Sequence, residues 1–172
     1  MRKLLPLKDI AVLKPFDCGD QDLNEFLCDN AILCEKEFLS KTYVLEDEEY
    51  TIAYFSLLAD KISKSLIPKA VWENLNSKIP EEKHFNSYPS VKIGRLAVHK
   101  LYKGQHIGAS ILSLISSMVL ASSEYVAFRF VTVDAYKSAR GFYEQNDFVP
   151  LIKEEKPDRN TVPMYMDLKE FY

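Results

Sequence analysis

Two kinds of hydrophobic periodicity alternate along this chain, and their order limits the folds that it can adopt. Segments with apolar residues at every second position are typical of strands, and a 3.6-residue repeat is typical of helices. From the N-terminus the patterns predict the order β-α-β-β-(α)-β-α-β-α-β-β. Such an order favours an α/β or α+β fold whose sheet carries helices on both faces. The chain has 172 residues, 47% of them hydrophobic, so we expect residues 1–172 to form a single domain with a full core.

The individual elements follow from local patterns and turn residues. Strands are expected at Leu4–Val12, Thr42–Leu45, Tyr50–Leu58, Val91–His99, Tyr125–Val133, Phe148–Ile152 and Pro163–Leu168. Helices are expected at Pro68–Leu75, after the loop that ends at Gly108, at Ser138–Gln145, and after a cap at Asp20 or Asp22. The apolar face of the helix after Gly108 is Ile111, Leu112, Ile115, Met118 and Val119, and the stripe of the helix after the cap is Leu23, Phe26, Leu27, Ala31 and Cys34. Loops are expected between Pro80 and Pro89 and at Lys153–Asn160.

The strand Val91–His99 changes the phase of its alternation. Val91 and Ile93 are apolar on one phase, and Leu96 and Val98 are apolar on the other. Because side chains alternate with a period of two, the phase changes only if an extra residue is inserted. We therefore predict a β-bulge at Gly94-Arg95, which would bend the strand and leave some backbone N–H groups unpaired.

A glycine-bearing loop, residues 102–108, leads from this strand into a helix. The N–H groups at a helix start and the helix dipole together favour an anion, and glycine lets a phosphate approach the backbone closely. The loop has neither the Walker phosphate-loop spacing nor GxGxxG. This pattern alone leaves open a mononucleotide, a dinucleotide, coenzyme A, or an ordinary tight loop.

Three segments together closely resemble the GNAT acetyltransferase superfamily: Ile93–Val98, Tyr102–Gly108 and Ala139–Phe148. The resemblance is strongest over residues 91–149 and extends in element order over about residues 1–170. It implies a GNAT-like mixed, mostly antiparallel sheet flanked by helices, with a bulged central strand splayed from its neighbour. It also implies an acyltransferase that uses acetyl-CoA as co-substrate and no metal.

The resemblance assigns the coenzyme A site residue by residue. In the family's loop pattern, (Arg/Gln)-x-x-Gly-x-(Gly/Ala), Lys103 takes the first place, His106 the first glycine and Gly108 the last. His106 is a departure from the family pattern, and so is Tyr136, which stands where the family often has asparagine. The implied cofactor-binding residues are Leu96, Ala97, Val98, Lys103, Gly104, Gln105, His106, Ile107, Gly108, Ala109, Ser138 and Phe142.

Tyr143 matches the tyrosine that is the family's usual general acid, and a core tyrosine is the alternative that its helical spacing allows. The N–H of Val98 would stabilise the oxyanion of the tetrahedral intermediate. No general base is obvious: Asp60, Glu48, Glu49, Asp134 and His99 are candidates that we expect to be surface residues. This favours an α-amine acceptor, whose pKa is about 8, or proton loss through water.

The acceptor is a small-molecule amine or an aminoacyl amine. Residues 16–19 and 23–27 resemble a GNAT subgroup of toxins that acetylate aminoacyl-tRNA and bind a ribbon-helix-helix antitoxin. The net charge of −3 argues against RNA binding, which needs clustered cations. The candidate basic patches are Lys61-Lys64-Lys69, Arg129 and Lys137-Arg140. We therefore expect a generic amine N-acetyltransferase first, the toxin second, and a non-catalytic acyl-CoA-binding regulatory module as a third alternative.

The remaining features concern compartment and assembly. Three cysteines, Cys18, Cys28 and Cys34, form no CxxC pair, so neither a disulfide framework nor a structural zinc site is expected. The N-terminus lacks the apolar core of a signal peptide, and the apolar stretch Ile107–Ala121 is too short and serine-rich to span a bilayer. We expect a cytoplasmic protein without a membrane partner, and a homodimer stays open.

Overall fold

The computed structural model describes residues 1–8, 13–80, 85–152 and 159–171. The chain forms two compact units. The first unit comprises Met1–Leu58 and Ile93–Ile115, and the second comprises Ala59–Lys92 and Ser116–Tyr172. The expectation of a single domain stays a prediction.

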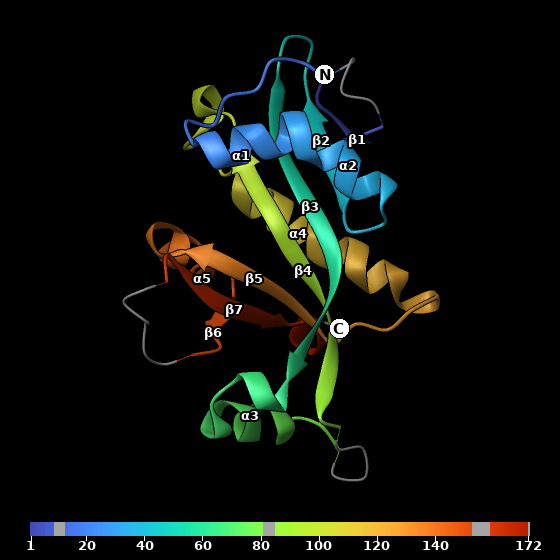
Figure 1. The fold of residues 1–172 in the computed structure, drawn as a ribbon, viewed down its shortest axis with the longest axis vertical. Helices are drawn as coiled ribbons and strands as arrows, with labels where there is room; N and C mark the ends of the chain where they lie inside the picture. The colour runs from blue at the N-terminus through green and yellow to red at the C-terminus, as the bar shows by residue number, and fades with distance from the viewer. Residues whose placement is uncertain (9–12, 81–84, 153–158, 172) are drawn as a thin grey trace. The chain divides into compact units, whose positions relative to one another are not determined.

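Seven strands are hydrogen-bonded in the order β1-β2-β3-β4-β5-β7-β6. Neighbouring pairs β1–β2, β2–β3, β5–β7 and β6–β7 are antiparallel. The strands are β1 Lys3–Pro6, β2 Lys41–Glu46, β3 Thr51–Ser63, β4 Ser87–Val98, β5 Phe130–Tyr136, β6 Val149–Pro150 and β7 Thr161–Asp167 (Figure 1). The helices are α1 Gln21–Glu25, α2 Ala31–Lys36, α3 Lys69–Asn76, α4 Ile107–Ala121 and α5 Arg140–Glu144. The predicted order of elements and the mixed, mostly antiparallel sheet are confirmed.

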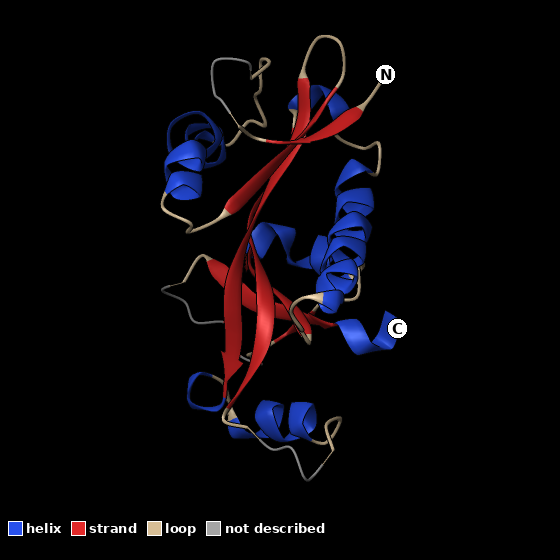
Figure 2. Cartoon of the chain, turned by 90° about the vertical axis from the view of Figure 1, so that its right-hand side faces the viewer, coloured by secondary structure: helices blue, strands red, loops and turns tan. Residues whose placement is uncertain are grey.

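In the first unit, helices cover the strands on both sides. The segment from α1 to α2 lies on one side of the strands, and the first half of α4 lies on the other (Figure 2). The Asp20 carboxylate accepts a hydrogen bond from the Leu23 N–H at 3.1 Å, which confirms it as the N-cap of α1. Leu27 and Ala31 of the predicted apolar stripe are fully buried. The expected single helix contains a π-helical turn, Phe26–Asn30, in which the Ala31 N–H donates to the carbonyl five residues back.

In the second unit, an aromatic cluster joins α3 to the sheet. Trp72 stacks on Tyr88 with a centroid distance of 5.1 Å, and Phe130 lies edge-on to Tyr165 at 5.6 Å. The Tyr88 hydroxyl donates to the Asn76 side chain at 2.5 Å, at the C-terminal end of α3. Helix α3 begins directly after Pro68, as its fixed φ favours. These contacts fix α3 against β4, β5 and β7.

Helix α4 combines a buried apolar face with exposed serines. Ile111, Ile115 and Val119 are at most 5% exposed, whereas Ser113 and Ser117 are exposed. The segment Ile107–Glu124 is nevertheless long and apolar enough to cross a membrane by length and composition alone, with a mean hydropathy of 1.4 over 18 residues. This length and composition differ from the expectation that the stretch Ile107–Ala121 is too short and serine-rich to span a bilayer. The one-sided burial is typical of a helix that covers a core.

Several strand boundaries differ from the predictions. β3 extends to Ser63 rather than to Leu58, and β6 is only Val149–Pro150. β5 begins at Phe130 rather than at Tyr125, and Tyr125 is 90% exposed, because strand propensity without pairing and burial does not make a strand. β4 begins at Ser87 and includes Pro89, which was expected in a loop. β1 ends at Pro6. Residues 9–12 of the expected strand, and residues 81–84 and 153–158 of the two expected loops, lie outside the described residues.

Candidate active site

The loop before α4 contains two residues with positive φ. Gly104 has a φ of +78°, and His106 has a φ of +56°. The left-handed region favours glycine, and histidine is among the non-glycine residues enriched there. His106, which stands where the family pattern has glycine, thus adopts the backbone conformation that a glycine would provide.

The start of α4 presents backbone donors beside this loop. The Ser110 N–H donates to the His106 carbonyl at 3.1 Å, so the N–H groups of Ile107, Gly108 and Ala109 precede the helical hydrogen-bond ladder. Lys103 and His106 are exposed. Since the positive end of the helix dipole lies at the same place, the segment has the geometry of an anion site.

Side chains of β3 lie close to the backbone of β4 at Gly94. A Cβ atom at this position would lie 2.9 Å from Leu58 Cδ2 and 2.9 Å from Ser56 Oγ. The requirement for glycine is therefore one of space. Ala97 is buried, and Leu96 and Val98 are half-buried. The bulge expected at Gly94-Arg95 stays a prediction.

Replacing Gly94 by alanine is expected to lower the free energy of unfolding by about 1–3 kcal/mol, because overpacking forces the Leu58 and Ser56 side chains to shift. Urea unfolding followed by circular dichroism measures the effect. Gly141→Ala is the matched control: nothing lies within 4 Å of an added Cβ in α5, so a gain of about 0.5–1 kcal/mol is expected. Equal stability of both variants would contradict the close approach.

His99 is buried at 4% exposure, so the expectation of a surface residue was wrong. Its Nδ1 accepts from the Leu101 N–H at 3.1 Å, and its ring packs against Tyr50 and Tyr102. The Tyr102 hydroxyl donates to Asp47 at 2.5 Å, which raises the pKa of Tyr102 to about 12 and lowers the pKa of Asp47 to about 2. These contacts hold the start of the 102–108 loop and make His99 a structural residue.

Tyr143 lies in the second unit on α5 and is 6% exposed. Its ring packs edge-on against Phe142 at 5.1 Å and Phe148 at 5.3 Å. Burial raises the pKa of the Tyr143 phenol well above its usual range, so it stays protonated at neutral pH. Tyr143 therefore has the packing of a core tyrosine and the protonation state that an acid requires.

The predicted site residues fall into two groups. Leu96–Val98 and Lys103–Ala109 belong to the first unit, and Ser138, Phe142 and Tyr143 belong to the second. Ser138 is exposed in a 3-10 turn, Lys137–Ala139, that leads directly into α5. In the first unit, the residues lie at the end of β4 and on the segment that leads into α4. In the second unit, they lie on the segment that leads into α5 and on α5 itself. Neighbours in the sequence are thus neighbours in each unit.

Three of the other candidates for the general base, Asp134, Glu48 and Asp60, interact with other groups. Asp134 pairs with Lys92 at 2.6 Å, and Glu48 pairs with the N-terminal ammonium. Asp60 is half-buried and accepts a hydrogen bond from Thr132 Oγ1 at 2.7 Å, so it is not the exposed residue that was expected. Within the described ranges, no group of three His, Cys, Asp or Glu side chains could hold a metal ion.

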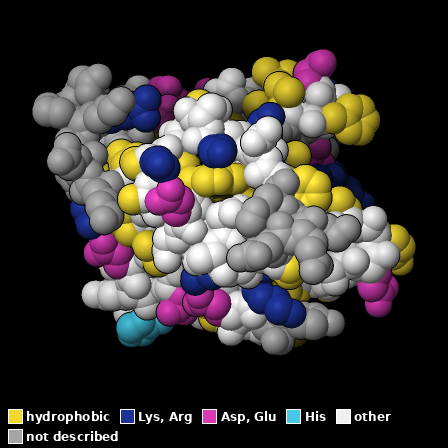
Figure 3. Space-filling view, turned by 90° about the horizontal axis from the view of Figure 1, so that it is seen from below, with side chains coloured by type: hydrophobic (Ala, Val, Ile, Leu, Met, Phe, Trp, Pro, Cys, Tyr) yellow, Lys and Arg dark blue, Asp and Glu magenta, His cyan; other side chains and the backbone are white. Residues whose placement is uncertain are grey.

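Two cations of the candidate basic patches, Arg129 and Lys69, are paired with carboxylates. Arg129 makes a bidentate ion pair with Asp167, at 2.7 and 2.9 Å, and Asp167 is buried. Lys69 lies 3.6 Å from Glu73. On the face shown in Figure 3, Lys and Arg side chains lie beside acidic and apolar ones. Arg129 is therefore a structural residue of the second unit and not a free cation for a phosphate.

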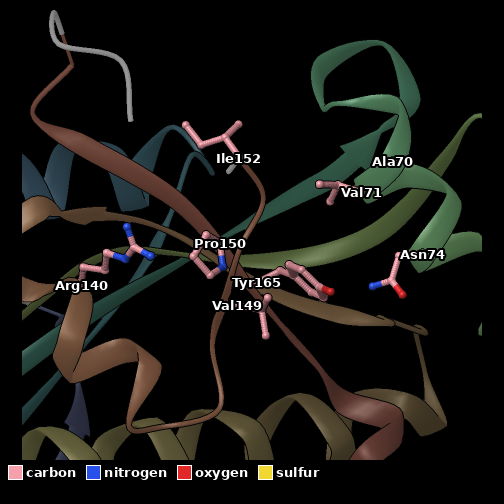
Figure 4. Close-up of a pocket in the computed structure, with 8 residues that line it drawn as sticks. All are labelled: Ala70, Val71, Asn74, Arg140, Val149, Pro150, Ile152 and Tyr165. Carbon is pink, nitrogen blue, oxygen red and sulfur yellow. The ribbon is translucent and has the colours of Figure 1, made fainter. Parts of the chain in front are cut away.

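A cavity of about 410 Å³ in the second unit was not predicted from the sequence. It is formed by side chains of α3, α5, β6 and β7 and the residues after β6 (Figure 4). Its lining residues are Ala70, Val71, Asn74, Arg140, Val149, Pro150, Ile152 and Tyr165. They come from four separate segments of the chain with no common spacing, so no sequence pattern could have identified them.

Comparison with known proteins decides the family. The profile of the acetyltransferase (GNAT) domain matches residues 83–169, half of the chain. The chain belongs to the GNAT acetyltransferase family. The matched range includes the GNAT loop before α4 and the tyrosine on α5.

Solved structures of GNAT-fold toxins share the architecture. One is AtaT complexed with acetyl-methionyl-tRNAfMet, with 23% identity, coverage of 99% of this chain and 97% of that chain, and a TM-score of 0.77. A tyrosine-to-phenylalanine mutant of KacT has 22% identity, 99% coverage of both chains and a TM-score of 0.76. AtaTR bound with acetyl-CoA has 23% identity, coverage of 98% and 95%, and a TM-score of 0.75. At these identities the likeness shows the GNAT fold.

Proposed function

We propose that this protein is an acetyl-CoA-dependent N-acetyltransferase that transfers the acetyl group to a primary amine by direct attack. The observation that carries this proposal is the GNAT family match over residues 83–169, which includes both the amide-bearing start of α4 and Tyr143. A neighbour of the same fold with bound acetyl-CoA supports the choice of co-substrate.

The residues of the first unit suit the diphosphate of coenzyme A. The N–H groups of Ile107, Gly108 and Ala109 and the dipole of α4 would bind the pyrophosphate, and Lys103 would add a positive charge. The backbone of Leu96–Val98 would pair with the pantetheine arm. His106 is compatible with this arrangement, because its φ of +56° lies in the left-handed region that a glycine adopts readily.

The reaction needs a neutral amine, an oxyanion donor and a proton for the leaving group. The amine nitrogen attacks the thioester carbonyl, and the Val98 N–H would stabilise the oxyanion. When the C–N bond is complete and the C–S bond breaks, Tyr143 would donate its hydroxyl proton to the departing sulfur. The proton released by the nitrogen leaves to solvent, and the phenolate is reprotonated from water.

A second candidate acceptor is an aminoacyl-tRNA, as in a toxin of a toxin–antitoxin pair. It is supported by the structural similarity to AtaT complexed with acetyl-methionyl-tRNAfMet over 99% of this chain. Exposed Lys61 and Lys64, at the end of β3 and after it, are cations that such an RNA could contact. A ribbon-helix-helix antitoxin as partner belongs to this second candidate alone. A cytoplasmic location is proposed for either candidate, and a homodimer stays open for both.

Labelled acetyl-CoA incubated with the protein and a cell extract tests both candidates. Mass spectrometry of the small-molecule, protein and RNA fractions is expected to show label on a primary amine. Label in the aminoacyl-tRNA fraction would select the second candidate. Tight binding of acetyl-CoA without transfer to any amine would overturn the enzyme assignment and favour a regulatory acyl-CoA-binding module.

A further inference from the structure

The cavity of the second unit has a wall of apolar side chains that water can reach. Val71 of α3 is half-buried, and so are Pro150 and Ile152, in β6 and just after it, whereas Val149 is 50% exposed. The volume of about 410 Å³ lies within the range of about 300–1,000 Å³ usual for ligand pockets. Because apolar surface is stabilised when it leaves water, this wall favours the apolar part of a ligand.

The floor of the cavity contains a buried hydroxyl group, that of Tyr165 in β7. Tyr165 is 4% exposed, and its ring is fixed edge-on against Phe130 at 5.6 Å. Its hydroxyl is directed toward Asn74 (Figure 4) and makes no hydrogen bond with any residue that the structure describes. Burial raises the pKa of this phenol, so the hydroxyl keeps its proton at neutral pH and can donate it in a hydrogen bond. Since a buried polar group without a partner is costly, this hydroxyl indicates a ligand with an acceptor atom.

The polar side chains that line the cavity can all donate hydrogen bonds. Besides the Tyr165 hydroxyl they are the Asn74 amide, on an exposed residue, and the Arg140 guanidinium, beside Pro150 in Figure 4. Arg140 is the one charged side chain among the described lining residues, and its 2.7 Å pairing with Glu144 is a partly exposed i,i+4 pair of the kind that contributes little. The lining therefore favours an anion with acceptor oxygens over a cation.

We propose that this cavity binds a small aliphatic carboxylate, at a site separate from the residues assigned to coenzyme A. The Tyr165 hydroxyl and the Asn74 amide N–H donate to the carboxylate oxygens, which together offer about four acceptor positions. The aliphatic chain lies along the apolar wall, and Arg140 supplies a positive charge. The residues assigned to coenzyme A are not among the described lining residues, so this site depends neither on the cofactor nor on the acceptor of the acetyl group.

Titration of the full chain with hexanoate, followed by calorimetry, tests the proposal. Saturable binding is expected with a Kd of about 1 mM or lower. The same Kd is expected with and without saturating coenzyme A, because the two sites share no residue. Hexanamide, an uncharged analogue of similar shape, is expected to bind about 10-fold more weakly, and hexylamine, with the opposite charge, is expected not to bind.

Two substitutions test the donors. Tyr165→Phe is expected to weaken hexanoate binding about 10-fold or more, and to leave the Tm of the ligand-free chain unchanged or raised, because the lost hydroxyl has no described partner there. Asn74→Asp, which places a second carboxylate beside the bound one, is expected to weaken binding at least as much. Asn86→Asp is the matched control: it makes the same change at an exposed asparagine outside the cavity lining, and the affinity is expected to stay the same.

Several outcomes would overturn the proposal. One is the lack of saturable hexanoate binding to the wild type, and another is unchanged affinity in both Tyr165→Phe and Asn74→Asp. Equal binding of hexanoate, hexanamide and hexylamine would show that the site does not select a carboxylate. Displacement of hexanoate by coenzyme A would place it in the cofactor site, and a Tm lowered by several degrees in Tyr165→Phe would show that the hydroxyl has a partner within the protein. Titration with coenzyme A alone tests the acetyltransferase assignment separately.

Discussion

Tyr143→Phe is expected to lower kcat for acetyl transfer about 100-fold or more and to change the Kd for acetyl-CoA less than about 2-fold. The ring and its contacts with Phe142 and Phe148 remain, so the packing of α5 is kept. Only the proton donor for the departing sulfur is lost. Steady-state kinetics with the labelled acceptor, together with calorimetric titration of acetyl-CoA, measures both quantities.

The pH profile separates the catalytic role from the packing role. Burial places the pKa of Tyr143 above the ordinary phenol value of about 10, so the acid is fully protonated at pH 6–9 and any rise of activity in that range must come from the amine. Because the folded-state pKa is raised, the contribution of Tyr143 to stability is constant below about pH 10 and falls as pH rises above it. Tyr143→Phe removes this one contribution to the alkaline loss of stability. Equal kcat for wild type and variant would exclude Tyr143 from catalysis.

His106→Val is expected to weaken the binding of coenzyme A about 10-fold or more, whereas His106→Gly keeps the wild-type Kd or lowers it. Position 106 has a φ of +56°, which costs a β-branched residue about 1–2 kcal/mol or more and a glycine nothing. A loop that leaves this conformation no longer presents the N–H groups of Ile107 and Gly108 to the diphosphate. Isothermal titration calorimetry of both variants gives the comparison.

The glycine variant serves as the matched control for the lost imidazole. If the valine and glycine variants bind equally, the backbone conformation does not govern the diphosphate site. If both bind weakly, the imidazole itself contributes, and the family's glycine pattern does not apply here. Either result would contradict the expectation drawn from the loop geometry.

Local patterns predicted a loop that leads into a helix start near residues 102–108, and the structure has both. The choice of Tyr143 came from the GNAT resemblance, because the local pattern alone favoured a core tyrosine, and the site assignment stays a prediction. The local patterns did not predict that His106 adopts a glycine-like φ or that His99 is buried. The burial of His99 depends on contacts with residues far along the chain. His99, for example, packs against Tyr50, 49 positions earlier in the sequence.

The sequence by itself determined the order of strands and helices, the Asp20 cap, and the place of the loop before α4. These depend on periodicity and on interactions within a few residues. Only the tertiary structure decided that Pro89 lies in β4, that Tyr125 is exposed outside β5, and that α3, α5 and β7 enclose a cavity. Strand pairing, burial and cavities arise from contacts between distant segments. A local pattern of residues does not specify which distant residues make these contacts.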